Sequence, residues 1–173
     1  MSFKRIDKEY FDSKISDFHE YSSNPLTFEF MKEIKPSKDI AETEKYFSNL
    51  LSDPKKLIYC VEIMGKVVGT ISMNCESKRR GIFSMGFAFS PLVWGQPSIL
   101  NDIVSVIIKT FEVENARRIE TITEIGNLRC QKLLDFMGFK KEGEKKGYYV
   151  PLDGSKPINA IIHAAFKDDI RKI

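Results

Sequence analysis

The feature that most constrains this chain is a change of hydrophobic period about one third of the way along it. Residues 7–18 and 41–51 carry apolar side chains at three- and four-residue spacing, which is typical of helices. Residues 57–90 instead form short runs rich in β-branched and aromatic residues, and Met64-Gly65-Lys66 between two of them is a hairpin signal. The chain therefore combines helices with an antiparallel meander.

The remaining pattern predicts how these parts are joined. Asp7 could cap the first helix and Ser37 the second, which would close at Asp53-Pro54. Beyond the strands at 57–64, 67–74 and 82–90, we expect helices at 99–115 and 127–137, a strand at 117–123, strand pieces at 139–142 and 147–150, and a last strand at 158–166. A strand–helix–strand order after a meander implies a mixed sheet with helices on its faces. We predict a single α/β (α+β) domain over residues 1–173.

Composition excludes several classes of protein. Hydrophobic residues are 42% and charged residues 29%, which argues against extensive disorder. With 27 Lys plus Arg and 24 Asp plus Glu, the net charge of +3 is too small to indicate a nucleic-acid-binding or membrane-surface protein. We interpret the basic clusters at 78–80 and at 140–141 with 145–146 as solvated charges.

Cysteine usage and the N-terminus suggest a cytoplasmic protein. The three cysteines, Cys60, Cys75 and Cys130, are odd in number and lack metal-ligand spacing, so we expect free thiols in a reducing compartment and no metal. The N-terminus becomes charged at once, without the apolar segment of a signal peptide. No run approaches the ~20 apolar residues that a membrane span needs.

Three stretches then stand in a recognisable order: Gly86-Phe87-Ala88-Phe89-Ser90-Pro91, Trp94-Gly95 before the long predicted helix, and Asn127 followed by Gly138-Phe139 and Glu142-Gly143. Together they resemble the GNAT superfamily of acetyl-CoA-dependent N-acetyltransferases. Within it they are most similar to the ribosomal-protein N-terminal acetyltransferase branch (RimJ/RimL type). The resemblance covers about residues 57–143 and implies a mostly antiparallel mixed sheet, splayed in the middle and flanked by helices on both faces.

The resemblance assigns acetyl-CoA to two backbone elements and one side chain. Backbone N–H groups of Phe87, Ala88 and Phe89 would bind pantetheine and polarise the thioester carbonyl, as donors aimed at a developing oxyanion do. The N-terminus of the following helix would bind pyrophosphate through its N–H groups and dipole. Asn127 would contact the pantetheine arm, and it also suits the N-cap of the helix that follows. For the basic clusters at 78–80 and at 140–141 with 145–146, the alternative to solvated charges is contact with the CoA phosphate or an acidic partner.

The loop expected to bind pyrophosphate departs from the family pattern. It comprises Gly95, Gln96, Pro97, Ser98 and Ile99. Pro97 replaces the central Gly and removes one N–H donor, and Ile99 replaces a small residue and would crowd the phosphates. Ser98 could restore one hydrogen bond through its hydroxyl. Because Pro also suits the first position of a helix, Pro97 could be only a helix-start residue.

The proton donor is left open between two interpretations of Cys130. Many GNAT enzymes have a Tyr seven residues after the Asn, and Leu134 at that position excludes this mechanism. The RimJ/RimL branch has a Ser three residues after the Asn, where this chain has Cys130. A thiol with a pKa near 8.5 suits a CoA thiolate leaving group, and placement in a first helical turn would lower that pKa. Cys130 could equally be a core thiol, because it shares helical spacing with Leu133 and Met137.

A proton acceptor is also expected near the open end of the sheet. Glu124 follows the strand that ends at Thr123, where a carboxylate could take the amine proton directly or through water. It could equally be a solvated loop charge. His19, on a helix expected to wall the substrate cleft, is interpreted as a surface or packed residue, and His163 as structural.

The sequence thus predicts an N-acetyltransferase that transfers acetyl from acetyl-CoA by direct attack of a primary amine. The acceptor would be a protein N-terminus or a small amine, and the protein a monomer or homodimer. The alternative is a degenerate GNAT domain that binds or regulates with weak or no catalysis. Pro97, Ile99 and Asn101, the last of which stands where the branch often has Glu, favour that alternative.

Overall fold

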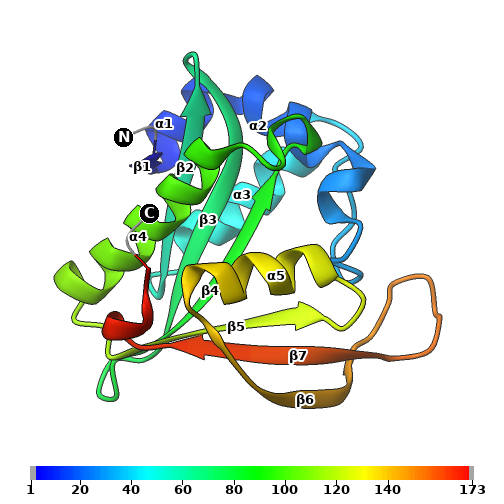
Figure 1. Ribbon diagram of the computed structural model, residues 1–173. Coiled ribbons are helices and arrows are strands. Elements are labelled where there is room, and N and C mark those ends of the chain that lie inside the picture. The colour runs from blue at the N-terminus through cyan, green and yellow to red at the C-terminus, as the bar shows by residue number, and fades with distance from the viewer. Residues whose placement is uncertain (1–2, 172–173) are drawn as a thin grey trace.

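The computed structural model describes residues 3–171, and its centre is a seven-stranded sheet with helices on both faces (Figure 1). The strands are β1 Phe3–Arg5, β2 Lys56–Ile63, β3 Lys66–Ser77, β4 Ile82–Phe89, β5 Arg118–Glu124, β6 Lys140–Tyr149 and β7 Ile158–Ala165. The helices are α1 Lys8–Ser13, α2 Ile15–Ser22, α3 Ile40–Ser52, α4 Pro97–Val113 and α5 Leu128–Met137, with 3-10 turns at Pro25–Phe28, Pro91–Val93 and Lys167–Asp169. The predicted single α/β domain with a mixed sheet is confirmed.

The N-terminal helices differ from the prediction in two places. Asp7 caps α1 as expected, but the helix breaks at Lys14, and α2 starts directly after it. Asp39, not Ser37, caps α3 by accepting a backbone hydrogen bond from the first turn. Ser37 lies before the helix, where its N–H donates to the Ser22 carbonyl at 3.0 Å. Its backbone is therefore fixed in the connecting segment, and the aspartate two residues later satisfies the helix end.

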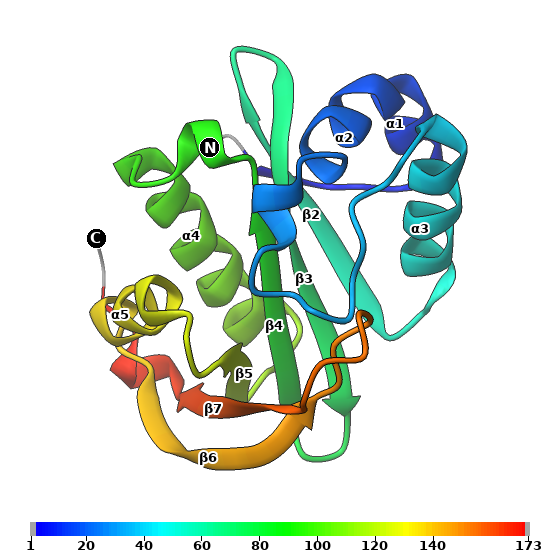
Figure 2. The same ribbon diagram turned by 90° about the vertical axis from the view of Figure 1, so that its right-hand side faces the viewer.

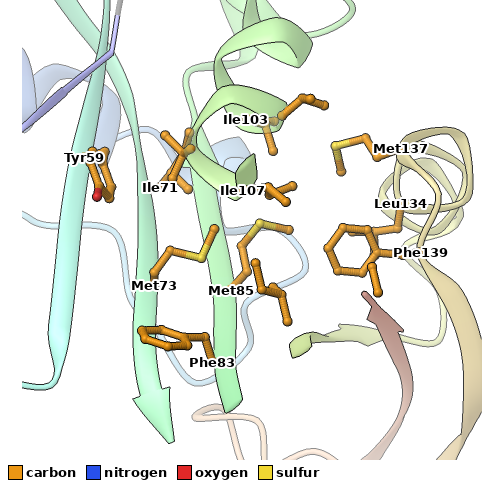
Figure 3. Close-up of a cluster of buried hydrophobic side chains, with 14 of the residues drawn as sticks. Tyr59, Ile71, Met73, Phe83, Met85, Ile103, Ile107, Leu134, Met137 and Phe139 are labelled. Carbon is orange, nitrogen blue, oxygen red and sulfur yellow. The ribbon is translucent and has the colours of Figure 1, made fainter. Parts of the chain in front are cut away.

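Each face of the sheet has its own core, which follows from the two-residue period of a strand. Along β2, Tyr59 and Val61 face α4 and α5, whereas Ile58 and Cys60 face α1, α2 and α3. Figure 2 shows the two helical layers on opposite sides of the strands. In Figure 3, apolar side chains from α4 and α5 meet those of the strands in the larger core.

The C-terminal part of the sheet is more continuous than expected. The two predicted strand pieces are one strand, β6, which pairs antiparallel with β7 and curves at two register shifts. α5 ends at Gly138, whose φ of +106° only glycine adopts readily, and a Cβ there would lie 1.9 Å from the Asp169 carbonyl oxygen. The basic clusters lie in the β3–β4 turn and along β6, where their side chains are exposed.

The sheet opens between β4 and β5, its one parallel pair. These strands pair only over Ile82–Arg118, Phe83–Ile119 and Ser84–Glu120, and they have no paired residues beyond this point in the described chain. The remaining halves of both strands run on to Phe89 and Glu124 without pairing to each other. The predicted splay in the middle of the sheet is therefore present, and it leaves backbone groups of both strands free for other partners.

Candidate active site

A cavity of about 820 Å³ occupies the opening between β4 and β5. Its walls come from the two strands, the N-terminal ends of α4 and α5, and the segment between α2 and α3. Ten of the predicted site residues line it: Phe87, Ala88, Phe89, Gly95, Gln96, Pro97, Ile99, Glu124, Asn127 and Cys130. Ser98 is exposed and lies outside this lining. Residues separated by up to 43 positions in the sequence (87 to 130) are thus gathered around one cavity.

The ladder between β3 and β4 decides which backbone N–H groups face the cavity. Ser90 donates its N–H to β3 at 2.8 Å, and residues of an antiparallel ladder alternate between bonded and non-bonded positions. Ala88 therefore directs its N–H toward β3, whereas Phe87 and Phe89 direct theirs into the opening. The Trp94 indole Nε1–H donates to the Phe89 carbonyl at 3.1 Å, which agrees with this orientation. The predicted set of three donors is reduced to Phe87 and Phe89.

The loop before α4 ends in an uncapped helix N-terminus beside the cavity. Pro97 is the first helical residue, and no side chain of residues 3–171 caps the helix at Gln96. Ile99 was expected to crowd the phosphates, but its side chain is buried in the larger core. Ile99 also lines the cavity, so its effect on the phosphates stays a prediction. The N-terminal dipole end of a 17-residue helix is thus left without a side-chain partner within the described chain.

The first turn of α5 borders the cavity opposite this loop. Asn127 caps α5 by accepting a hydrogen bond from the Cys130 N–H at 3.1 Å, so its predicted capping role is present in the structure. Arg129 places its guanidinium carbon 3.6 Å from the centroid of the Trp94 ring, and both side chains line the cavity. This cation–π contact joins α5 to the loop before α4 and fixes a positive charge at the cavity wall.

Glu124 is a buried carboxylate and not a solvated loop charge. It is the last residue of β5, is 8% exposed, and lines the cavity. Its Oε2 atom is buried without a hydrogen-bond partner among residues 3–171. Burial raises the pKa of Glu124, the Lys32 charge opposes this shift, and Glu29 reinforces it. A carboxylate in this state accepts a proton more readily than one in water.

Cys130 lies between the cavity and the larger core, with its side chain packed against that core. Burial raises its pKa to about 12, and the nearby Arg129 charge lowers it only in part. The expected lowering by the first helical turn is therefore outweighed by desolvation. Leu134, which occupies the position of the tyrosine in other family members, is fully buried in the core.

Comparison with known proteins agrees with this geometry. Residues 10–140 match the acetyltransferase (GNAT) domain family, which is more than half of the chain. The chain belongs to the GNAT acetyltransferase family. By this membership it is an acyl-CoA-dependent acetyltransferase.

Individual relatives of this GNAT chain are distant. It is 25% identical over 134 residues to the uncharacterized N-acetyltransferase p20 of Bacillus licheniformis, which covers 75% of each chain. A GCN5-related N-acetyltransferase from Brucella melitensis has a TM-score of 0.83 at 18% identity, covering 96% of this chain and 76% of that one. Spermidine N-acetyltransferase from Vibrio cholerae, solved with CoA and spermine, has a TM-score of 0.80 at 13% identity, covering 96% and 95%. At these identities the solved structures show a shared fold.

Sequence reasoning missed Tyr149 in this GNAT domain. Its phenol donates to the Ile122 carbonyl at 3.0 Å, and it lines the cavity. Burial raises its pKa to about 12, with smaller contributions from neighbouring groups that include Cys130 and Glu124. No local signal identified Tyr149, because its place depends on how β6 returns along β7. A tyrosine hydroxyl therefore occupies the β5 side of the opening.

The histidines lie away from the cavity. The Nδ1 atom of His19 is 2.8 Å from the Thr43 hydroxyl, between α2 and α3. His163 is buried in β7, where burial lowers its pKa. Residues 3–171 bring together no group of three or more potential metal ligands. None of the helices in the same residues is long and apolar enough to cross a membrane.

Proposed function

We propose that this chain transfers an acetyl group from acetyl-CoA to a primary amine by direct attack in the cavity between β4 and β5. The observation that carries the proposal is the buried Glu124 carboxylate, whose Oε2 atom has no hydrogen-bond partner among residues 3–171, in the same cavity as the β4 backbone that does not pair with β5. These are a proton acceptor and oxyanion donors on one site, which is what attack on a thioester requires.

The cofactor end of the cavity offers groups suited to a long anionic molecule. The uncapped N-terminus of α4 and the Arg129 guanidinium would hold the pyrophosphate, and together they replace the N–H that Pro97 lacks. The Asn127 side chain would contact the pantetheine arm while it caps α5. Phe87 and Phe89 would donate their N–H groups to pantetheine and to the thioester carbonyl.

At the other end, Glu124 would receive the amine. An ammonium group would pair with its carboxylate, which would then take the proton directly or through one water before attack. The raised pKa makes Glu124 a stronger base than an exposed carboxylate. Cys130 keeps its proton at neutral pH, since its pKa is about 12, and its thiol would donate a hydrogen bond to the leaving sulfur. We do not propose full proton transfer from Cys130, because a CoA thiolate is the weaker base.

The experiment that tests this function combines acetyl-CoA with a panel of amines and follows release of free thiol. Turnover with at least one primary amine, and its loss in Glu124→Gln, would support the proposal. If acetyl-CoA binds and no primary amine, including peptides with free N-termini, accepts the acetyl group, the protein is a binding module. Its classification among the RimJ/RimL-type enzymes is likewise a proposal, which acetylation of a peptide N-terminus would support.

A further inference from the structure

The end of the cavity away from α4 has a mostly apolar wall. It is formed by the segment between α2 and α3, which contributes Leu26, Phe30, Met31 and Ile34 to the lining. Two hydrogen bonds attach this segment to the loop after β6: Leu152 N–H to the Lys32 carbonyl at 3.1 Å, and Val150 N–H to the Glu33 carboxylate at 3.1 Å. The wall is therefore fixed in place by a contact between distant parts of the chain, which Figure 2 shows as the orange and blue loops meeting.

Some polar side-chain atoms of the residues at this end have no hydrogen-bond partner in the described chain. Among residues 3–171, five buried side-chain atoms have no hydrogen-bond partner, and three of them belong to cavity residues: Thr27 Oγ1, Thr123 Oγ1 and Glu124 Oε2. Buried polar atoms in proteins are rarely left unpaired. All three atoms are covered by their surroundings, so the cavity residues Thr27, Thr123 and Glu124 hold polar groups that the fold leaves without a protein partner.

The charges at this end suit a single cation. Two carboxylates of the described chain line the cavity, and that of Glu33 already accepts the Val150 N–H. Glu124 is the buried one of the two and Glu33 is exposed, so Glu124 is the carboxylate that an ammonium would meet inside the cavity. The nearby charges of Lys32 and Glu29 act on Glu124 in opposite directions. A second ammonium on the same ligand would meet the apolar side chains of this wall, which is unfavourable for a charge taken from water.

Resting on the proposed function, we propose that the acceptor is a primary amine with one positive charge on an apolar body. Its ammonium would pair with Glu124, and its body would pack against Phe30 and Met31. This acceptor class differs from polyamines such as spermidine, which carry several charges and require several carboxylates. On this proposal, the residues at the acceptor end of the cavity determine which amine is acetylated, and the residues at the cofactor end do not.

The test compares acceptors at saturating acetyl-CoA: phenethylamine, the n-alkylamines from butylamine to hexylamine, spermidine, and peptides with free Met and Ala N-termini. We expect kcat/KM for phenethylamine to exceed that for spermidine at least about tenfold. Each added methylene of the alkylamines should raise kcat/KM about three- to fourfold, since that is the gain from burying one methylene. Stabilisation of the CoA-bound protein against thermal unfolding by phenethylamine, and not by spermidine, gives a readout that needs no turnover.

A matched pair of variants tests the role of the wall. Met31→Glu adds a further carboxylate to the two that already line the cavity and should shift the kcat/KM ratio toward spermidine at least about tenfold. Met64→Glu makes the same change at a fully exposed hairpin residue and should leave the ratio unchanged. In the unaltered protein, preference for spermidine, preference for the Ala peptide over the Met peptide and the apolar monoamines, or no transfer to any monoamine although acetyl-CoA binds, would overturn the inference. If the protein does not bind acetyl-CoA, the proposed function itself is wrong, and the inference about the acceptor fails with it.

Discussion

The guanidinium of Arg129 lies 3.6 Å from the centroid of the Trp94 ring, so the first turn of α5 and the loop before α4 are in direct contact across the cavity wall. Trp94 is held from its other side by the hydrogen bond of its indole to the Phe89 carbonyl. The pair thus connects Arg129, which is expected to bind the pyrophosphate, to strand β4, which is expected to bind the thioester. As the chain's single tryptophan, Trp94 also reports on this site by its fluorescence.

The first prediction concerns Arg129. Arg129→Ala should weaken acetyl-CoA binding about tenfold. It removes both the positive charge that would pair with the pyrophosphate and the stacking of the guanidinium on Trp94. Arg129→Lys should weaken it less, since lysine keeps the charge without the planar fork. Titration of Trp94 fluorescence with acetyl-CoA measures both. Lys145→Ala removes a cation–π contact on the exposed β6 and serves as the control. Equal affinity in all variants would show that the Arg129–Trp94 contact is purely structural.

The second prediction concerns Pro97. Pro97→Gly restores a backbone N–H at the first turn of α4 and should tighten acetyl-CoA binding about threefold to tenfold, the effect of about one hydrogen bond. The fold should persist, because Pro97 is exposed and the helix it starts is held by its buried face. Calorimetric titration gives the affinity and a thermal melt gives the stability. An unchanged affinity would mean that Pro97 only starts the helix.

The third prediction couples activity and stability at Glu124. Glu124→Gln should lower kcat about a hundredfold or more, the usual contribution of a general base. It should also raise the free energy of unfolding at pH 7. Because the folded-state pKa of Glu124 is raised, its contribution to stability is complete below the unfolded pKa of about 4.3 and is lost as pH rises through the folded pKa. Gln cannot ionise, so it avoids that loss.

Measurement of the free energy of unfolding at several pH values tests whether Glu124→Gln is more stable than the unaltered protein at neutral pH. The difference between Glu124→Gln and the unaltered protein should grow as pH rises through the folded pKa and then stay constant. Glu9→Gln, in the exposed first turn of α1, should leave this pH dependence unchanged. In the unaltered enzyme, kcat/KM should fall as pH decreases through the pKa of Glu124. A Glu124→Gln protein that is less stable at neutral pH would show that the ionised carboxylate is satisfied in the fold.

The fourth prediction separates the two interpretations of Cys130. If the thiol donates a hydrogen bond to the leaving sulfur, Cys130→Ala should lower kcat about tenfold with little change in acetyl-CoA affinity, and Cys130→Ser should recover part of the loss. If Cys130 only packs against the core, both variants should lose stability and keep kcat per folded molecule. Steady-state kinetics corrected for folded fraction distinguish these results. Because burial raises the pKa of Cys130 to about 12, ionisation of this thiol should add no pH dependence to kcat near neutral pH.

Much of the fold could be predicted from the sequence because its signals are local. The period of two along residues 57–89 places alternate side chains in two cores, and the Met64-Gly65 turn closes their hairpin with positive φ angles. The break at Lys14 could not be found in the same way, because Phe11, Ile15 and Phe18 also fit one continuous helix. Their burial in a shared aromatic cluster is what orients α1 and α2 separately.

The parts of the candidate site that are formed by the backbone could be predicted from the sequence. The parts that are formed by side chains were harder to predict. The β4 strand, the loop before α4 and Asn127 could be assigned to one site because their motifs stand in the order of the GNAT pattern. The burial of Glu124 was not visible, since it depends on the segment between α2 and α3 that covers it. Tyr149 and the Arg129–Trp94 contact likewise arise from packing between distant elements.

The measurement that tests the account most directly is a titration of the purified protein with acetyl-CoA, followed by calorimetry and by Trp94 fluorescence together. The account predicts one site per chain with a Kd in the micromolar range, about −8 kcal/mol, and a change in fluorescence that saturates at the same concentration. No heat and no fluorescence change at millimolar acetyl-CoA, in protein shown to be folded by its thermal melt, would contradict it.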